Sequence, residues 1–262
     1  MRTLVIIPTY NERENVGSIV GRVRASVPDA DVLIVDDGSP DGTGELADAL
    51  AATDGSVHVL HRAGKEGLGA AYRDGMTWAL DAGYSTIVEM DADGSHQPEQ
   101  LPRLLAVLRD GDEAGADVVL GSRWVDGGGV VNWPARRRLI SRGGSAYSRM
   151  ALGLPVKDVT GGYRAFTADA LRALHFDRTE SQEYCFQIDM TRRAYDAGLR
   201  IVEVPITFVE RSVARPRWAA GSWWRPCSAS RCGARRHPAA VPQAFTGANG
   251  GAGGPGVAWR HG

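Results

Sequence analysis

Ser85-Thr86-Ile87-Val88-Glu89-Met90-Asp91-Ala92-Asp93 is an apolar run that ends in two carboxylates separated by one residue. The run predicts a buried strand. Asp-x-Asp at a strand end can present a carboxylate to a hard divalent cation, which prefers oxygen ligands. Alone the pattern is weak, because two acidic residues after a strand are more often turn or cap residues. Its meaning therefore depends on what the fold places beside it.

Two earlier runs of the chain also end in polar residues. Pro8-Thr9-Tyr10-Asn11-Glu12 follows the apolar run Leu4–Ile7, and Val35-Asp36-Asp37-Gly38-Ser39-Pro40-Asp41-Gly42-Thr43 closes the next run. Because open α/β sheets bind ligands at the carboxyl ends of their strands, three such ends predict one site. Asp36 and Asp37 are consecutive, so strand alternation predicts that one points toward the sheet and the other toward the cleft.

Strands and helices are expected to alternate as far as Leu120. The expected strands are Leu4–Ile7, Asp31–Asp36, Val57–His61, Thr86–Met90 and Asp117–Leu120, with helices at Glu12–Val27, Thr43–Ala52, Gly67–Ala82 and Pro98–Arg109. This order predicts right-handed βαβ units and a Rossmann-like α/β fold, with a mostly parallel sheet flanked by helices. The segments expected after it are a mobile glycine-rich loop at Trp124–Asn132, helices at Pro134–Leu152 and Glu183–Ala197, and extended chain at Arg200–Val204 and Ile206–Val209.

The composition changes near Val213. Residues from Ala214 onward contain seven arginines and no lysine, aspartate or glutamate, and they lack leucine, isoleucine, methionine and tyrosine. A segment without large aliphatic residues cannot bury enough surface to offset its chain entropy. We therefore expect a folded domain at residues 1–213 and an atypical, low-complexity, disordered tail at 214–262, whose composition resembles a frameshifted reading frame. Trp218, Trp223 and Trp224 offer an alternative role as an anchor at a membrane interface.

Two bulk properties bear on the partners. The formal net charge of −1 gives no reason to expect nucleic acid as the main partner. No apolar run approaches the ~20 residues of a membrane-spanning helix, so any membrane contact is expected to be peripheral.

Six motifs together give the chain a specific resemblance. Over about residues 1–213 it resembles the family 2 glycosyltransferases of the GT-A fold, and among them the polyprenol (dolichyl) phosphate mannose synthases. The motifs are Ile7-Pro8-Thr9-Tyr10-Asn11-Glu12, Val35-Asp36-Asp37-Gly38-Ser39-Pro40-Asp41-Gly42-Thr43, Met90-Asp91-Ala92-Asp93-Gly94-Ser95-His96, Gly121-Ser122-Arg123-Trp124, Thr160-Gly161-Gly162-Tyr163-Arg164 and Glu203-Val204-Pro205-Ile206-Thr207-Phe208-Val209-Glu210-Arg211.

The resemblance implies a nucleotide-sugar pocket at the predicted strand ends. Tyr10 would lie beside the base, while Glu12 and Asp37 would accept hydrogen bonds from the base or ribose. The donor-binding residues implied in this way are Pro8, Tyr10, Glu12, Val35, Asp37, Asp91, Ala92, Asp93, Arg123 and Arg211. Taken as residue types alone, Pro8, Tyr10 and Glu12 also fit a turn, an aromatic lid on the sheet and a first-turn carboxylate that the helix dipole favours.

The resemblance also implies a cation site. Asp91 and Asp93 would bind Mg²⁺ or Mn²⁺ across the donor's diphosphate, with Ser95 adding an oxygen directly or through water. Such a cation neutralises charge as the nucleoside diphosphate leaves. His96 better fits a local hydrogen-bonding role than a metal ligand. The residues implied in catalysis are Asp91, Asp93, Arg123 and Arg211.

Arginines are implied as phosphate ligands. Arg123, Arg137 and Arg211 resemble the family residues that hold the donor diphosphate and the acceptor lipid phosphate, and the guanidinium fork suits phosphate. A phosphate acceptor would explain why no histidine or cysteine nucleophile stands out, because a phosphate monoester is already ionised near neutral pH. Positioning and charge stabilisation would then carry most of the catalysis. Asp158 fits either a place near the sugar or a turn.

The chain departs from the family pattern at two places. Glu183-Tyr184-Cys185-Phe186-Gln187 stands where relatives often read Gly-Tyr-x-Phe-Gln, which weakens the assignment of the sugar. Ser212-Val213-Ala214-Arg215-Pro216-Arg217 replaces a Gly-x-Ser-Lys segment, so a lysine contact to phosphate is lost. Arg215 or Arg217 would have to replace that lysine with a different geometry.

These features predict an inverting, metal-dependent transfer of mannose from GDP-mannose to a polyprenyl monophosphate, giving polyprenyl phosphomannose and GDP. We expect the protein to be cytoplasmic and peripheral at the inner face of the plasma membrane, where a membrane-protein partner is one route to the lipid. Two alternatives stay open. One is the same fold and acceptor with UDP-glucose as donor, and the other is a product that binds nucleotide but is catalytically impaired by its tail.

Overall fold

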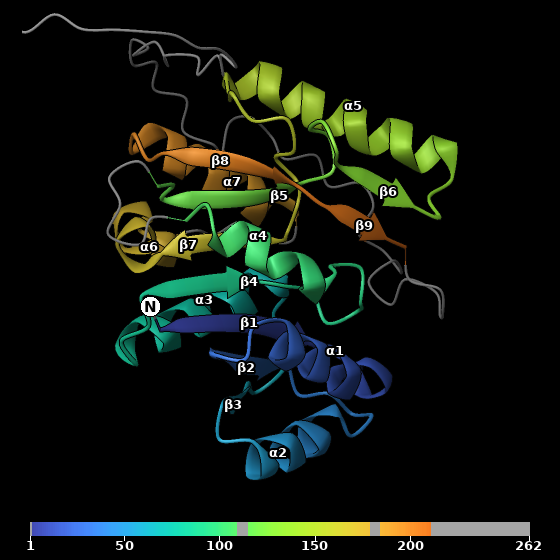
Figure 1. Ribbon diagram of the computed structural model, residues 1–262, viewed down its shortest axis with the longest axis vertical. Coiled ribbons are helices and arrows are strands. Elements are labelled where there is room, and N and C mark those ends of the chain that lie inside the picture. Colours follow the sequence, from blue (N-terminus) through green and yellow to red (C-terminus); the bar gives the residue numbers. More distant parts are fainter. Residues whose placement is uncertain (1, 109–114, 179–183, 211–262) are drawn as a thin grey trace, which may run out of the picture. The chain divides into compact units, whose positions relative to one another are not determined.

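The structure is a computed structural model that describes residues 2–108, 115–178 and 184–210 (Figure 1). The chain separates into two compact units, Met1–Arg225 and Pro226–Gly262, and every described residue belongs to the first. Glu183, Arg211 and the predicted tail from Ala214, with its possible frameshift, lie outside the described residues.

Within the described residues, one sheet of seven strands forms the centre of the fold. Its strand order is β3 (Val57–His61), β2 (Ala30–Asp36), β1 (Thr3–Thr9), β4 (Thr86–Glu89), β7 (Arg164–Thr167), β5 (Val118–Ser122) and β8 (Ile201–Pro205). β7 runs antiparallel to both neighbours, and the other adjacent pairs are parallel. The predicted α/β fold with a mostly parallel sheet is therefore confirmed.

Helices cover both faces of this sheet (Figure 1). α3 (Leu68–Asp81), α6 (Ala168–Leu174) and α7 (Tyr184–Asp196) pack on one face, while α1 (Arg13–Ser26), α2 (Thr43–Thr53) and α4 (Leu101–Leu105) pack on the other. β1 serves both cores, because Leu4 and Ile6 point to the first and Val5 and Ile7 to the second. A strand buried on both faces explains its continuous apolar sequence.

The strand register decides where the polar motifs leave the sheet. Thr9 of β1 pairs with Asp36 of β2, and Ile6 of β1 pairs with Glu89 of β4. The segments that follow these three strands therefore emerge at the same edge, as parallel strands require.

Two elements lie in a stretch that no prediction covered. Arg164–Thr167 forms β7 and Ala168–Leu174 forms α6. Thr167 caps that helix by accepting a hydrogen bond from Ala170 N at 3.1 Å, which is a common way to satisfy a first-turn donor. The predicted helix at Pro98 is also shorter than expected, since a 3₁₀ turn (Pro98–Gln100) precedes α4.

The glycine-rich loop is partly ordered as a strand. Gly129–Val131 forms β6, which pairs in parallel with β9 (Thr207–Val209) to make a separate two-stranded sheet. The prediction of a mobile loop is wrong for these residues, because their partner lies far along the chain. The predicted basic helix follows as α5 (Ala135–Leu152). No helix of the described residues is long and apolar enough to span a membrane.

Candidate functional site

Hydrogen bonds join the segments that follow β1 and β2. Asp36 accepts from Thr9 Oγ1 at 3.0 Å and from the backbone N and Oγ of Ser39 at 3.0 and 2.6 Å. Glu12 N donates to Thr43 Oγ1 at 3.0 Å. The two strand-end motifs therefore form one wall whose shape is fixed by its own bonds.

Asp37 is the second carboxylate of this wall, and it is paired with Arg62. Arg62 Nη1 donates to Asp37 Oδ1 at 2.5 Å, while its Nε and Nη2 bind Asp74 at 2.7 Å and Glu66 at 3.0 Å. Burial raises the pKa of Asp37 above its usual value, and Arg62 opposes that rise. Asp36 and Asp37 are 2% and 3% exposed, so the expectation from strand alternation that one carboxylate would be buried and the other open to the cleft is wrong for their exposure. The turn at Ser39 covers Asp36, and Arg62 covers Asp37.

Tyr10 and Glu12 lie at the end of β1. Lys65 Nζ lies 4.4 Å from the centre of the Tyr10 ring, a cation–π distance. Glu12 is buried, and its Oε2 accepts from Asn15 Nδ2 at 2.6 Å. It stands just before α1, where the helix dipole favours a carboxylate. Both residues are at the edge predicted for the nucleoside, and that assignment stays a prediction.

Pro8, Val35 and Ala92 completed the predicted nucleotide set. Pro8 is half-buried and pairs with Val35 across β1 and β2. The side chains of Val35 and Ala92 are buried in the two hydrophobic cores. A ligand at this edge would therefore meet the backbone of Val35 and Ala92 rather than their side chains.

Asp91 and Asp93 follow β4 at the same edge. Asp91 Oδ1 accepts from the Tyr72 hydroxyl at 3.3 Å, and Asp91 N donates to His96 Nδ1 at 3.1 Å. Asp93 Oδ1 accepts from Ser95 N at 2.9 Å. His96 is buried, and the bond to its Nδ1 confirms the predicted local hydrogen-bonding role.

This donor set fits a hard divalent cation. The Asp91 side chain is 33% exposed, and Ser95 Oγ is buried without a hydrogen-bond partner among the described residues. Carboxylate and hydroxyl oxygens are ligands that Mg²⁺ and similar ions accept. No cluster of three or more histidine, cysteine, aspartate or glutamate side chains in the described residues makes a complete cage. A cation here would need further oxygens, such as those of a diphosphate.

A buried polar layer lies next to these carboxylates. Gln187 Nε2 of α7 donates to Glu89 Oε2 at 3.0 Å, and the fully buried Arg164 binds the carbonyls of Gln187 at 3.0 Å and Gly161 at 2.8 Å. Burial raises the pKa of Glu89 to about 7, although the charge of Arg164 opposes the rise. A Cβ on Gly162 would lie 3.9 Å from Asp91 Oδ2, so the glycine segment passes close to the predicted cation site.

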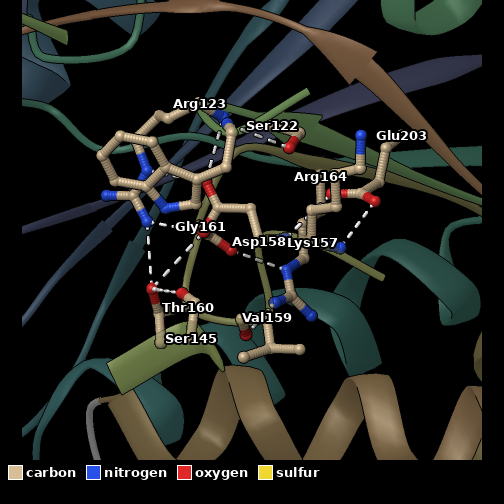
Figure 2. A network of polar contacts seen from close by, with 11 residues as sticks. Ser122, Arg123, Ser145, Lys157, Asp158, Val159, Thr160, Gly161, Arg164 and Glu203 are labelled. Atoms are coloured by element: carbon tan, nitrogen blue, oxygen red, sulfur yellow. Dashed lines mark hydrogen bonds and ion pairs between the residues drawn. The ribbon is translucent and has the colours of Figure 1, made fainter. Parts of the chain in front are cut away.

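Arg123 and Asp158 form a buried ion pair beyond that segment (Figure 2). Arg123 Nε and Nη2 donate to the two Asp158 oxygens at 2.7 Å each, and Nη2 also donates to Thr160 Oγ1 at 3.0 Å. Burial alone would raise the pKa of Asp158, but the hydrogen bonds and charge of Arg123 outweigh it, and the pKa is lowered. Both Asp158 oxygens are thus engaged by Arg123 and the carboxylate is a weaker proton acceptor than usual, which argues against a role as a base.

An aromatic cluster surrounds the arginines. The guanidinium of Arg123 lies 5.5 to 5.6 Å from the ring centres of Trp124, Trp133 and Phe208. Arg137, from the first turn of α5, lies 4.4 Å from the Trp133 ring and pairs with Glu210. The structure therefore groups Arg123 and Arg137 around Trp133, whereas Arg211 lies outside the described residues.

Several residues of this region did not stand out in the sequence. Arg62 and Tyr72 reach the site from segments that carry none of the strand-end motifs, and Glu89 was counted only as part of a strand. Gln187 stood in the Glu183–Gln187 motif, but its bond to Glu89 was not predicted. Glu89 is an acidic residue inside an otherwise apolar run, and this was the signal that the sequence offered for a buried partner, since a charged residue is seldom buried without one.

The sequence of the chain is similar to those of known proteins. Residues 4–174 match the model of Glycosyl transferase family 2. An undecaprenyl-phosphate mannosyltransferase of Micrococcus luteus is 58% identical over 221 residues, covering 84% of this chain and 89% of that protein. A polyprenol monophosphomannose synthase of Mycolicibacterium smegmatis is 56% identical over 213 residues, covering 81% and 79%.

A solved structure shares the fold. It is a mannosyltransferase from Pyrobaculum calidifontis in complex with GDP-Man and Mn²⁺, with a TM-score of 0.55 and 21% identity. The match covers 82% of this chain and 58% of that one.

Proposed function

The chain belongs to glycosyl transferase family 2, and from this premise we propose that it transfers mannose from GDP-mannose to a polyprenyl monophosphate. The observation that carries the proposal is the 58% identity, over 84% of the chain, to an undecaprenyl-phosphate mannosyltransferase. The mannosyltransferase of the same fold whose structure contains GDP-Man and Mn²⁺ supports the donor and a divalent cation.

The carboxylates after β4 would hold the cation. Asp91 and Asp93 offer oxygens at the edge of the sheet, and Ser95 Oγ is the buried hydroxyl that a further bond would satisfy. A bound Mg²⁺ or Mn²⁺ supplies charge neutralisation at the diphosphate as the nucleotide leaves. Tyr72 orients Asp91 by donating to its Oδ1, so the ligand is preorganised.

The wall formed by the ends of β1 and β2 would take the nucleoside. Tyr10 offers an aromatic face, and Glu12 and Asp37 offer carboxylates that would accept from a ribose hydroxyl or a base N–H, as acidic residues do in dinucleotide folds. Arg62 holds Asp37 in place and opposes the rise that burial causes in its pKa. This pocket would orient the donor so that its anomeric carbon faces the acceptor.

The acceptor phosphate would approach from the side of the aromatic cluster. One of its oxygens attacks the anomeric carbon, the bond from that carbon to the diphosphate breaks, and GDP leaves with the electron pair. A single displacement of this kind inverts the configuration. The phosphate needs no general base, so orientation and charge carry the catalysis. Arg137 and Arg211 would supply that charge, while Arg123 holds Asp158 and Thr160 in place and offers its remaining N–H groups to a phosphate.

A lipid acceptor implies work at a membrane. The described residues contain no spanning helix, so the protein would act peripherally at the cytoplasmic face of the plasma membrane, alone or with a membrane-protein partner. The product would be a polyprenyl phosphosugar, which we propose as a donor for later glycosylation of proteins or lipoglycans.

The test is transfer of label from GDP-mannose into lipid. The full-length purified chain is incubated with labelled GDP-mannose, polyprenyl phosphate and Mg²⁺ or Mn²⁺, and label is counted in the organic phase. Competing UDP-glucose should leave the signal unchanged; strong competition would instead support the glucose alternative. Asp93→Asn should abolish both transfer and metal-dependent GDP binding.

Two negative results have different meanings. Metal-dependent GDP binding without transfer, restored when the Gly-x-Ser-Lys segment is rebuilt after Arg211, would show a product impaired by its tail. Absence of transfer in both the natural and the rebuilt chain would reject the proposal.

A further inference from the structure

β9 lies between the two halves of the candidate site. The strand continues from β8 beyond the carboxyl ends of the parallel strands (Figure 1). On one side of it is the loop of residues 91–96 (the cation loop), which carries the predicted cation ligands. On the other side are Arg123 and Arg137, which are proposed to receive the acceptor phosphate. The proposed function assigns β9 no contact with either substrate, so the role of the strand has to follow from what it touches.

Two contacts attach β9 to the cation loop. Val209 N donates to the Ser95 carbonyl at 3.1 Å. One residue earlier, the Phe208 ring meets the ring of the buried His96 edge-on, with the ring centres 5.6 Å apart. His96 accepts in turn from Asp91 N at 3.1 Å. Phe208 is therefore separated by one side chain from the backbone of a predicted cation ligand.

The same phenylalanine ring touches the acceptor side. The guanidinium of Arg123 lies 5.5 Å from the centre of the Phe208 ring, within the range of a cation–π contact. The Trp133 ring meets Phe208 edge-on at 5.4 Å, and Trp133 also carries the guanidinium of Arg137 at 4.4 Å. Phe208 thus contacts His96 of the cation loop and Arg123 at the same time.

β9 is also held by the elements around it. Thr207 N donates to Gln100 Oε1 at 2.8 Å, and the Thr207 carbonyl accepts from Gln100 Nε2 at 3.3 Å. Glu210, the residue after the strand, donates from its N to the Val131 carbonyl at 3.0 Å and forms an ion pair with Arg137. Packed side chains and hydrogen-bonded elements of this kind are what carries coupling between two sites.

The orientation of Arg123 depends on these rings. Asp158 and Thr160 accept from its Nε and Nη2, and aromatic rings surround the guanidinium on its other sides. Among those rings, Phe208 is the one that meets His96. The setting of Phe208 therefore affects how the remaining N–H groups of Arg123 are presented to a phosphate.

We propose that Phe208 is a positioning residue that couples the donor side of the site to the acceptor side. A cation and diphosphate bound at the cation loop fix that loop, and its contacts with β9 then fix the Phe208 ring. Because the ring is already ordered, an acceptor phosphate at Arg123 loses less entropy on binding and binds more tightly than to the empty protein. The proposal rests on the proposed function for the identity of the two ligands.

The test is the effect of one ligand on the binding of the other. Calorimetry measures the Kd of farnesyl phosphate, a short polyprenyl monophosphate, for the full-length chain, first alone and then with saturating GDP and Mg²⁺. Neither ligand carries a sugar, so no transfer occurs during the measurement. In wild type, GDP and Mg²⁺ should lower the Kd of farnesyl phosphate by about fivefold or more.

The variants remove the ring without changing any charge. In Phe208→Leu the direct electrostatic effect of the cation and diphosphate on the acceptor stays, so a fall in the ratio of the two Kd values reports the route through the ring. We expect this ratio to fall by about threefold, whereas Phe208→Tyr, which keeps the ring, should retain it. Phe176→Leu is the matched control, because Phe176 is a buried ring of the core beside α6 and α7. It should lose stability and keep the ratio.

A second measurement needs no acceptor. The Trp124 ring lies 5.6 Å from the guanidinium of Arg123, so the NMR signal of its indole N–H reports on the surroundings of that arginine. Trp124→Phe identifies the signal. Titration with GDP and Mg²⁺ should shift it in wild type and in Phe176→Leu, and should shift it less in Phe208→Leu. If Phe208→Leu is unfolded by circular dichroism, Phe208→Met replaces it with the same expected results.

Three results would overturn the proposal. They are a Kd ratio in Phe208→Leu equal to that of wild type, an equal fall of the ratio in Phe176→Leu, and a shift of the Trp124 signal that Phe208→Leu leaves unchanged. Failure of the proposed function gives a different result, since wild type would then bind no farnesyl phosphate with or without GDP. The Trp124 signal would in that case decide on the coupling by itself.

Discussion

Arg123 holds the carboxylate of Asp158 with both arms of its guanidinium group, at 2.7 Å on each side. Its backbone N also donates to Asp158 Oδ2 at 3.0 Å. Asp158 is fully buried and Arg123, the residue after β5, is 8% exposed, so this pair fixes the start of the Thr160-Gly161-Gly162 segment. The segment then passes Asp91 at the predicted cation site.

Breaking this pair should destabilise the fold. Asp158→Ala leaves a buried guanidinium without its partner, and we expect the free energy of unfolding to fall by about 3–5 kcal/mol. Urea denaturation measures the change. The control is Asp169→Ala, which removes an exposed i,i+3 ion pair with Arg172 on α6 and should cost below about 0.5 kcal/mol. If Asp158 also acted as a base, Asp158→Asn would lower the rate of transfer per folded molecule as well as the stability.

The hydroxyl of Tyr72 should tune the cation site. Burial first, and then the nearby Asp91 carboxylate, raise the pKa of Tyr72, so the hydroxyl keeps the proton that it donates to Asp91. Tyr72→Phe removes this bond and should weaken Mn²⁺-dependent GDP binding several-fold, as the loss of outer partners of a ligand does. Calorimetry with Mn²⁺ and with EDTA measures the effect.

Tyr84 provides a matched control for Tyr72. Its hydroxyl donates to Asp31 Oδ2 at 2.5 Å, at the start of β2 and thus at the opposite edge of the sheet. Tyr84→Phe removes the same kind of bond and should leave GDP binding unchanged. Equal losses in the two variants would mean that Tyr72 acts through general stability rather than through Asp91.

The sequence predicts the strands and helices whose formation depends on residues within the same segment. β1, β2 and β4 are apolar runs closed by polar motifs, so their existence and shared edge follow from pattern and parallel topology. β7 was missed because Arg164-Ala165-Phe166-Thr167 is short and begins with a charged residue. Arg164 is fully buried and donates to the carbonyls of Val159 and Gly161 just before β7 and of Gln187 on α7. No local pattern reveals the partner on α7.

The same distinction holds for the candidate site. Asp91 and Asp93 are visible in the sequence because they sit on one motif at a strand end. Tyr72, which orients Asp91, lies on α3. Arg62, which pairs with Asp37 in the neighbouring wall, is the residue after β3. Those contacts depend on how the helices and strands pack, which single-residue chemistry does not specify.

Removing Arg62 should make stability depend more strongly on pH. In the wild type, burial already raises the pKa of Asp37 against the opposing charge of Arg62. Arg62→Met removes that opposition, so the pKa of Asp37 rises further. A carboxyl whose pKa is raised by folding stabilises the fold at low pH, and this contribution is lost as the pH rises through its folded pKa.

The loss of free energy of unfolding in Arg62→Met, relative to wild type, should therefore be larger at pH 8 than at pH 5. At pH 8 it should reach about 3 kcal/mol, the cost of an unpaired buried charge. Urea titrations at the two pH values measure it. Arg62 also binds the exposed side chains of Asp74 and Glu66, so Asp74→Asn/Glu66→Gln is the control and should cost little at either pH. A deficit that is equal at both pH values would show that Asp37 is not the group responsible.

Ser95 offers the sharpest test of the cation site. As a buried hydroxyl without a partner it costs stability, whereas as a metal ligand it strengthens binding, so its removal should change the two measurements in opposite directions. Its Oγ is buried with no hydrogen-bond partner among the described residues, so Ser95→Ala removes an unsatisfied group and should leave the metal-free protein equally stable or more stable by up to about 1 kcal/mol. If the hydroxyl is a ligand, the same variant should weaken Mn²⁺-dependent GDP binding while GDP binding in EDTA stays unchanged. Ser122→Ala is the control, since Ser122 Oγ accepts from Trp124 N at 3.3 Å; that variant should lose stability and keep the metal dependence. Unaltered Mn²⁺-dependent binding in Ser95→Ala would remove Ser95 from the ligand set and leave the two aspartates as the protein's share of it.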